Sequence, residues 1–255
     1  MGCTGERYSN MTFSVNSHNS IVNNSPVNIS EIVQIDGNVT ANSDIVDNID
    51  KISASSNLPI VASYNCRSLF PKVESFKTDV LERMVDVSFT CEIWEKKENK
   101  LHKQEIEKML EMNGLKYISN PRPSTRNGGG VAIVVNCERF SCERLNIYIP
   151  GGLEVVYGLL KPKCSSAKYK KIILCSFYSP PTTRRNSKLA DHIVGTLQML
   201  STKYPNCQII LGGDKKQMDI TPILNCGLRE VIIKKKNESM DSVQTFLDPP
   251  HAPLK

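Results

Sequence analysis

The chain has 255 residues, of which 40% are hydrophobic and 23% charged, and its formal net charge is +6. This length and composition suit one large globular domain with a tail and exclude a chain that is disordered throughout. No apolar run approaches the roughly 20 residues that span a bilayer, and the N-terminus lacks a basic start followed by an apolar core. We therefore expect an intracellular protein, nuclear or cytoplasmic, that is neither secreted nor held in a membrane.

Residues 1–57 differ in composition from the rest of the chain. They contain ten Asn and ten Ser, and their only aromatic side chains are Tyr8 and Phe13. Such a stretch buries too little apolar surface to offset the entropy lost on ordering, so we expect a disordered leader. It holds two basic and six acidic residues, which leaves 30 basic against 20 acidic in residues 58–255, a net +10. That excess suits a polyanion such as DNA, and a solvated basic surface is the alternative.

From residue 58 onwards, short apolar runs alternate with amphipathic segments, as in layered α/β domains. Residues 59–65 predict a strand, and the segment behind Pro71 predicts a helix. This helix repeats its apolar residues at helical spacing: Val73, Phe76, Val80 and Met84. Residues 85–92 predict a second strand, and residues 101–114 predict a helix closed by Gly114.

The remaining segments predict a buried sheet with one further amphipathic helix. The helix spans residues 186–203, with its apolar face formed by Leu189, Ile193, Thr196, Leu197 and Leu200. The strands are predicted from β-branched content and turn-like borders. They cover residues 130–135, 153–160, 171–178, 207–214 and, more weakly, 243–247.

The nine cysteines form no CxxC pair and have no His at zinc-finger spacing. Several, including Cys175 and Cys207, lie within apolar strand-like runs, where a free Cys behaves as a small hydrophobic residue. We therefore expect reduced thiols.

Four polar residues stand where predicted strands end: Asn65, Glu92, Tyr178 and Asp214. Metal-assisted phosphodiester hydrolysis needs oxygen ligands, a group that orients water and donors to the phosphate. Strand ends in a layered α/β fold converge on one edge, where these residues could meet. Taken singly, each has a plainer interpretation as a turn former or a surface acid.

Five strings, in this order and spacing, carry a resemblance to a known family: SYNCRSLFPK, FTCEIWEK, NPRPSTRNGGGVAIVV, CSFYSPP and ILGGDKKQMD. Together they resemble the endonuclease domain of non-LTR (LINE-type) retrotransposons, a branch of the endonuclease/exonuclease/phosphatase superfamily. The resemblance covers roughly residues 58–248. It implies a four-layer α/β sandwich over residues 58–255, with two stacked mixed β-sheets flanked by helices and an incomplete C-terminus.

The resemblance also implies a role for each strand-end residue. Asn65 and Glu92 would hold a divalent cation, Mg²⁺ or Mn²⁺. Tyr178 would contact the scissile phosphate, and Asp214 would orient the attacking water. Asp241, in a late motif, would support a catalytic His.

The partner implied is DNA, which such a domain nicks to expose a 3′ end for reverse transcription. Arg122 and Arg126 are candidates for contacts with the DNA backbone, with solvated loop charge as the alternative. The glycines at 128–130 are followed by a strand and by no GK[ST], so we expect a flexible turn and not a phosphate loop. Trp94 is expected to pack as core beneath the metal ligands. No segment resembles the reverse transcriptase that accompanies this domain in the family.

Two departures from the family pattern concern the site. Lys216 stands where the family has an Asn, and its ammonium group donates hydrogen bonds but accepts none. The family's closing Ser-Asp-His triplet is missing; Asp191-His192 lies in a predicted helix ahead of the GGD motif, and His251 is a still poorer substitute. Two hypotheses follow: an endonuclease with impaired activity, or a non-catalytic remnant or nucleic-acid-binding module.

Overall fold

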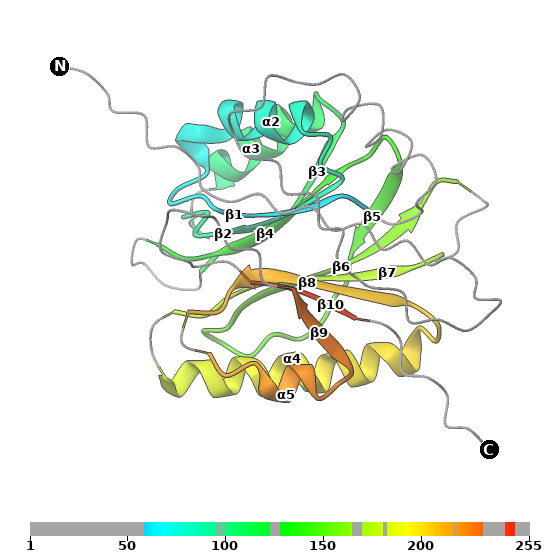
Figure 1. Ribbon diagram of the computed structural model, residues 1–255. Coiled ribbons are helices and arrows are strands. Elements are labelled where there is room, and N and C mark those ends of the chain that lie inside the picture. Colours follow the sequence, from blue (N-terminus) through cyan, green and yellow to red (C-terminus); the bar gives the residue numbers. More distant parts are fainter. Residues whose placement is uncertain are drawn as a thin grey trace, which may run out of the picture.

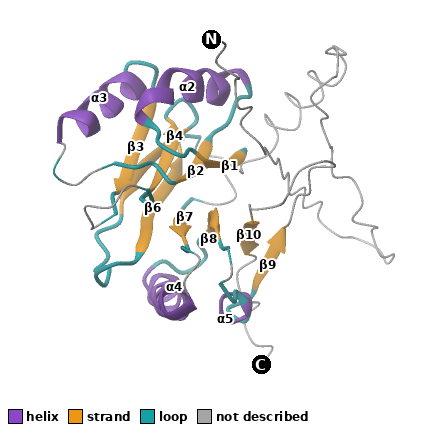
Figure 2. Cartoon of the chain, turned by 90° about the vertical axis from the view of Figure 1, so that its left-hand side faces the viewer, coloured by secondary structure: helices purple, strands orange, loops and turns teal. Residues whose placement is uncertain are grey.

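The computed structural model describes residues 59–95, 98, 100–122, 128–164, 170–180, 183–216, 218–231 and 243–247. In this part of the chain, two stacked β-sheets lie between two layers of helices (Figures 1 and 2). Helices α2 (Val73–Glu82) and α3 (Lys100–Glu111) cover the outer face of one sheet. Helices α4 (Thr183–Lys203) and α5 (Thr221–Leu224) cover the outer face of the other. The predicted four-layer sandwich is confirmed.

The first sheet has four strands in the order β1-β2-β4-β3. β1 and β2 are parallel, and β4 is antiparallel to both of its neighbours, so the sheet is mixed. Its strands are β1 (Val61–Asn65), β2 (Val87–Cys91), β3 (Leu115–Asn120) and β4 (Val131–Asn136). Because β1 and β2 are parallel neighbours, Asn65 and Cys91 end the two strands opposite each other.

The second sheet has six strands in the order β5-β6-β7-β8-β10-β9. Only the β7–β8 pairing is parallel, and it aligns Tyr178 with Asp214 at the ends of the two strands. The strands are β5 (Phe140–Arg144), β6 (Glu154–Pro162), β7 (Ile172–Tyr178), β8 (Gln208–Asp214), β9 (Leu228–Val231) and β10 (Val243–Leu247). Both sheets therefore present the carboxyl ends of a parallel pair.

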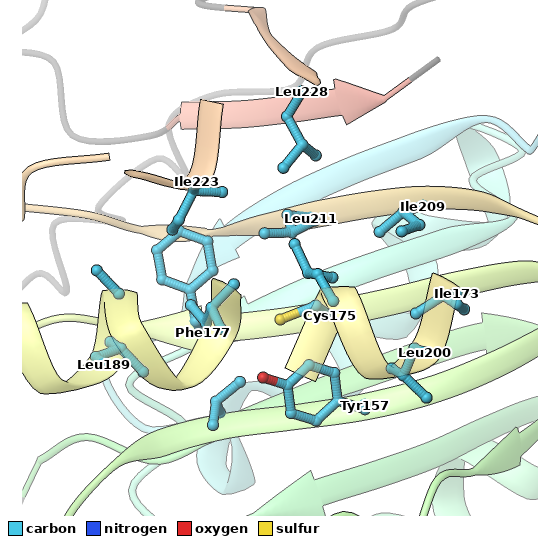
Figure 3. Packing of buried hydrophobic residues seen from close by; sticks show 14 of the residues in the cluster. Tyr157, Ile173, Cys175, Phe177, Leu189, Leu200, Ile209, Leu211, Ile223 and Leu228 are labelled. Carbon is cyan, nitrogen blue, oxygen red and sulfur yellow. The ribbon is translucent and has the colours of Figure 1, made fainter. Parts of the chain in front are cut away.

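Apolar side chains fill three layers: between the sheets, under α2 and α3, and under α4 and α5. In the last of these, Leu189 and Leu200 of α4 pack with Phe177 and Cys175 of β7 (Figure 3). All five residues predicted for the apolar face of α4 are buried. The prediction for α2 needs one correction: the helix ends at Glu82, and Met84, with φ of 51°, turns away and is 43% exposed.

The two glycines before Asp214 allow close packing around β8. A Cβ on Gly212 would come within 2.1 Å of the Phe89 ring, which belongs to the layer between the sheets. A Cβ on Gly213 would lie 2.0 Å from the carbonyl oxygen of Phe177 on β7. Real side chains do not tolerate such distances, so both positions require glycine for the strand to lie where it does.

At the end of the first sheet where β2 begins, a buried carboxylate ties strands and turns together. Asp86 Oδ2 accepts hydrogen bonds from the Ile60 amide and from Arg139 Nη1, each at 2.8 Å. The Asp86 carbonyl oxygen accepts from the Asn136 amide. Burial raises the pKa of Asp86 to about 6, although the Ile60 amide and Arg139 act in the opposite direction.

Among the described helices, none has the length and apolar character needed to cross a membrane. The cysteines of the described residues are all free thiols, as predicted. Residues 1–57 lie outside the described part of the chain, so the disordered leader stays a prediction.

Candidate active site

The structure brings four of the predicted site residues together at one end of the sandwich. Asn65 and Glu92 come from the ends of β1 and β2 in the first sheet, and Asp214 ends β8 in the second. Asn65 Nδ2 donates to Glu92 Oε1 at 3.0 Å and to Asp214 Oδ2 at 3.3 Å. One amide group therefore bridges both carboxylates and joins the two sheets.

Tyr178, the last residue of β7, completes this cluster. Its side chain is buried and lies close enough to Glu92 and Asp214 for their charges to act on its phenol. Burial raises the pKa of Tyr178 well above its usual range, and the negative charges of Glu92 and Asp214 raise it further, while Arg122 opposes them. The phenol thus stays protonated at neutral pH and can donate a hydrogen bond to an anionic oxygen.

The loops after β1 and β2 contain residues with positive φ. Glu92 has φ of 52°, and Arg67 and Ser68 have φ of 40° and 79°. The Ser68 amide donates to the Glu92 carbonyl at 2.8 Å, and the Leu69 amide donates to the Ile93 carbonyl at 3.0 Å. Positive φ is costly for residues with a Cβ and persists where surrounding contacts fix it. Here these backbone hydrogen bonds join the loop after β1 to the loop after β2, where Glu92 lies.

Asp214 is paired with the lysine that departs from the family pattern. Its Oδ2 lies 3.1 Å from Lys216 Nζ, and its Oδ1 accepts from the Lys216 backbone amide at 3.2 Å. Asp214 is 3% exposed and Lys216 has φ of 41°. A tight turn thus folds the ammonium group back onto the carboxylate, so the cluster contains an internal cation.

Cys91 lies under the cluster and links the sheets through its thiol. Its Sγ donates to the Phe177 carbonyl at 3.3 Å. Burial raises the pKa of this thiol well above its usual value, and the charge of Asp214 adds to the effect. The group is therefore a neutral thiol and adds no charge to the site.

Arg122 reaches the same end of the molecule, held by an acid that the sequence analysis missed. Arg122 Nε donates to Glu154 Oε1 at 2.8 Å, and its guanidinium carbon lies 5.8 Å from the centre of the Tyr178 ring. Glu154 is opposite Tyr178 in the β6–β7 register and is 2% exposed. The signal in the sequence was an acid at the start of the apolar run of β6, since an acid is rarely buried without a partner.

The structure corrects one further expectation here. Trp94 is 41% exposed and not core: its φ of 55° and the hydrogen bond from its amide to the Gly129 carbonyl turn it outward, beside the glycine turn. That turn lies against Arg122, since a Cβ on Gly129 would come within 2.2 to 2.3 Å of its guanidinium, and the flexibility of the turn stays a prediction.

Of the remaining candidates, three have no described position, and the Asp191-His192 pair lies in α4. Arg126, Asp241 and His251 lie outside the described residues. His192 of α4 packs edge-on against Tyr157, with ring centres 6.0 Å apart, beneath the second sheet. His192 thus packs in the layer between α4 and the second sheet, and its lack of a catalytic role stays a prediction.

The donor set of the cluster fits a hard divalent cation. Glu92 and Asp214 supply carboxylate oxygens, and Mg²⁺ typically binds one or two carboxylates and fills its other positions with water and phosphate. Asn65 faces both carboxylates with its Nδ2, so it would ligate a cation through Oδ1 once the amide group turns over. The described residues contain no group of three or more His, Cys, Asp or Glu side chains arranged around a metal, so a closed structural zinc site is not found among them.

Comparison with solved structures establishes the fold. The chain superposes on the human Nocturnin catalytic domain with a TM-score of 0.53 and 12% identity, covering 72% of this chain and 81% of that one. It is also similar to a mannosyl-6-phosphatase of Bacteroides thetaiotaomicron, with a TM-score of 0.53 and 13% identity, covering 73% of this chain and 84% of that one. An endonuclease/exonuclease/phosphatase family protein of the same bacterium gives a TM-score of 0.52 and 13% identity, covering 73% of this chain and 80% of that one.

No family model matches the sequence, and no curated protein matches it either. At these identities the structural likeness concerns the fold alone. The chain therefore has the endonuclease/exonuclease/phosphatase fold, as its sequence predicted.

Proposed function

We propose that this chain is the endonuclease domain of a retrotransposon-type protein, which nicks DNA with the help of a divalent cation and whose activity is lowered by Lys216. The observation that carries the proposal is the bridge from the Asn65 amide to the carboxylates of Glu92 and Asp214. It joins three strand ends from two sheets in the order that the resemblance to LINE-type endonucleases implies. A chance set of turn residues would have no reason to meet in this way.

Each side chain in the cluster has chemistry that suits phosphodiester hydrolysis. Asn65 and Glu92 would hold Mg²⁺ or Mn²⁺, which when bound neutralises charge on the phosphate. Asp214 orients the attacking water and accepts its proton. Tyr178 is protonated at neutral pH and donates to a non-bridging phosphate oxygen. Asp241 precedes β10 by two residues in the sequence and remains the candidate that would support a catalytic His.

The charge of the domain supports a polyanionic substrate. Residues 58–255 carry 30 basic and 20 acidic side chains. Contacts between such cations and phosphates supply most of the affinity of proteins for DNA of any sequence. Arg122, which lies beside Tyr178, and Arg126, four residues later in the sequence, are candidates for these contacts. An intracellular location, nuclear or cytoplasmic, belongs to the same proposal.

The ion pair of Lys216 with Asp214 favours a second candidate, a nucleic-acid-binding module without catalysis. The ammonium group lies 3.1 Å from the carboxylate oxygen that would receive the proton of the attacking water. A carboxylate held by a cation is a weaker base and a poorer ligand. In this alternative the basic surface binds nucleic acid while the cluster is inert.

A plasmid-nicking experiment tests the proposal. Supercoiled DNA is incubated with the full chain and Mg²⁺ or Mn²⁺, beside Glu92→Ala and the control Asp86→Asn at the other end of the sheet. We expect metal-dependent nicking by the wild type and by Asp86→Asn, and a loss of at least about a hundredfold in Glu92→Ala. Salt-dependent DNA binding without nicking by the wild type would instead support the binding module.

A further inference from the structure

Glu154 is a buried acid whose hydrogen bonds connect the start of β6 to the candidate site. It lies directly beside Tyr178 in the sheet register. Its Oε1 accepts from Arg122 Nε at 2.8 Å, and its Oε2 accepts from the Gly130 amide. Burying a carboxylate is costly unless it is paired and hydrogen bonded, and this one is both. The position of Glu154 is therefore coupled to that of Arg122.

The guanidinium of Arg122 lies between the Tyr178 ring and the glycine turn. It lies 5.8 Å from the centre of the Tyr178 ring on one side, and the glycine turn packs against it on another. A Cβ on Gly129 would fall within 2.3 Å of three guanidinium atoms, and one on Gly128 would lie 3.5 Å from Nη1. The three glycines have φ between 71° and 95°, which side chains with a Cβ rarely adopt. The glycine turn thus lies directly against the Arg122 side chain.

A second buried ion pair lies at the other end of the sandwich, and it differs from the Arg122–Glu154 pair in what it contacts. Arg139 and Asp86 also form a pair at 2.8 Å with a carboxylate that is 4% exposed. That pair ties Ile60 and Asn136 to the start of β2. It lies beside none of the four residues of the candidate site, whereas the Arg122–Glu154 pair lies against Tyr178.

We propose that Glu154 is a positioning residue, which holds the Arg122 guanidinium beside Tyr178 so that this cation binds a non-bridging oxygen of the nucleic-acid backbone. The inference rests on the proposed function in one respect, that the phosphate belongs to a nucleic acid. The planar fork of Arg matches the geometry of a phosphate, and holding it in advance lowers the entropy lost on binding.

The test is a double-mutant cycle on DNA binding. Glu154→Gln, Arg122→Gln and the double variant are compared in the full chain by fluorescence anisotropy of a labelled duplex in EDTA, where cleavage is absent. We expect each single variant to raise Kd about fivefold to tenfold, the size of one charged hydrogen bond. The double variant should bind like Arg122→Gln alone, because Glu154 acts through Arg122. Arg122→Lys, which keeps the charge and loses the fork, should give an intermediate Kd.

Arg139→Gln is the matched control, since it leaves a buried carboxylate unpaired far from the site. It should lower the Tm as much as Arg122→Gln and leave Kd unchanged. A Kd for Glu154→Gln equal to that of the wild type, or a double variant in which the two losses add, would overturn the inference. So would a wild type that binds no DNA.

Parallel nicking assays separate this inference from the proposed function. If the wild type nicks DNA and Glu154→Gln has an unchanged KM, the inference alone fails. If the wild type binds DNA with the expected coupling but never nicks it, the proposed function alone fails. A raised KM with a smaller change in kcat would support both, because Arg122 would contact the bound substrate as well as the transition state.

Discussion

The two ends of the sandwich hold buried polar side chains in different ways. At one end, Asp86 and Arg139 tie the start of β2 to neighbouring backbone. At the other, Asn65, Glu92, Tyr178 and Asp214 contact each other across both sheets. Positive φ is concentrated at this second end: of the seven non-glycine residues with positive φ in the described chain, five follow β1, β2 or β8 there, namely Arg67, Ser68, Glu92, Trp94 and Lys216.

The contrast between the two ends gives a way to recognise candidates for function among buried polar groups. Hydrogen bonds that satisfy backbone groups, as at Asp86, are what any stable sheet needs. Polar side chains that hydrogen bond mainly with one another, next to backbone with costly positive φ, point to a hypothesis of function. Variants at matched positions of the two ends test this distinction.

The largest contrast is expected between Asp214→Asn and Asp86→Asn. If Asp214 accepts the proton of the attacking water, its isosteric replacement lowers the single-turnover nicking rate by about a thousandfold. Asp86→Asn should change the denaturation midpoint and keep the rate within about threefold of the wild type. Equal losses of activity in both variants would mean that the two ends do not differ in function.

A second contrast concerns how closely β8 approaches the first sheet. Gly212→Ala places a methyl group against the Phe89 ring, and we expect a loss of about 3 kcal/mol in the free energy of unfolding. A methyl group on Gly195 of α4 would meet no atom within 4 Å, so Gly195→Ala should instead stabilise by up to about 1 kcal/mol. Urea denaturation measures both, and a neutral Gly212→Ala would show that the sheets can separate at little cost.

The third prediction concerns the pH dependence of the end that holds Asp86. Its pKa is raised to about 6 in the folded protein, so the folded state binds this proton more tightly than the unfolded state, whose ordinary Asp pKa is lower. The stabilising contribution is present in full below about pH 4 and is lost as pH rises through 6. Relative to Asp86→Asn, the wild type should lose about 3 kcal/mol across this window in urea denaturation series. If the free energy of unfolding changed with pH in the same way for the wild type and Asp86→Asn, the prediction would be wrong.

The smallest expected effect is that of Lys216→Asn. Removing the ammonium group 3.1 Å from Asp214 should lower the half-saturating Mg²⁺ concentration for nicking about tenfold, equivalent to about 1.4 kcal/mol. Lys188→Asn, at an exposed position of α4, removes the same charge far from the cluster and should leave this concentration unchanged. If both variants behave alike, the bulk charge of the domain matters and the Lys216 ion pair does not.

Much of the fold could be predicted because its strands are β-branched runs that end in polar residues. The stretches around β1, β7 and β8 have this form, and parallel neighbours in a sheet end at the same edge. The gathering of Asn65 with Asp214 followed from this rule once the order of motifs suggested a family. Strands β3, β5 and β9 were not predicted, since polar residues interrupt their apolar pattern.

The contacts between distant segments could not be predicted from local patterns. Arg122 and Glu154 are 32 residues apart, and no periodicity links a loop arginine to the first residue of a later strand. The exposure of Trp94 depends on a positive φ that its residue type disfavours. In the same way, the sequence showed that Lys216 was unusual, and the turn that folds it onto Asp214 required the structure.

The outward position of Trp94 has a practical consequence. It is the only tryptophan of the chain, it is 41% exposed, and it lies beside the glycine turn two residues after Glu92. The intrinsic emission of the protein on excitation of indole therefore comes from one place, next to the polar cluster. A cation or an oligonucleotide that binds there changes the surroundings of this fluorophore, so its arrival can be followed in unlabelled protein by the colour and intensity of the emitted light.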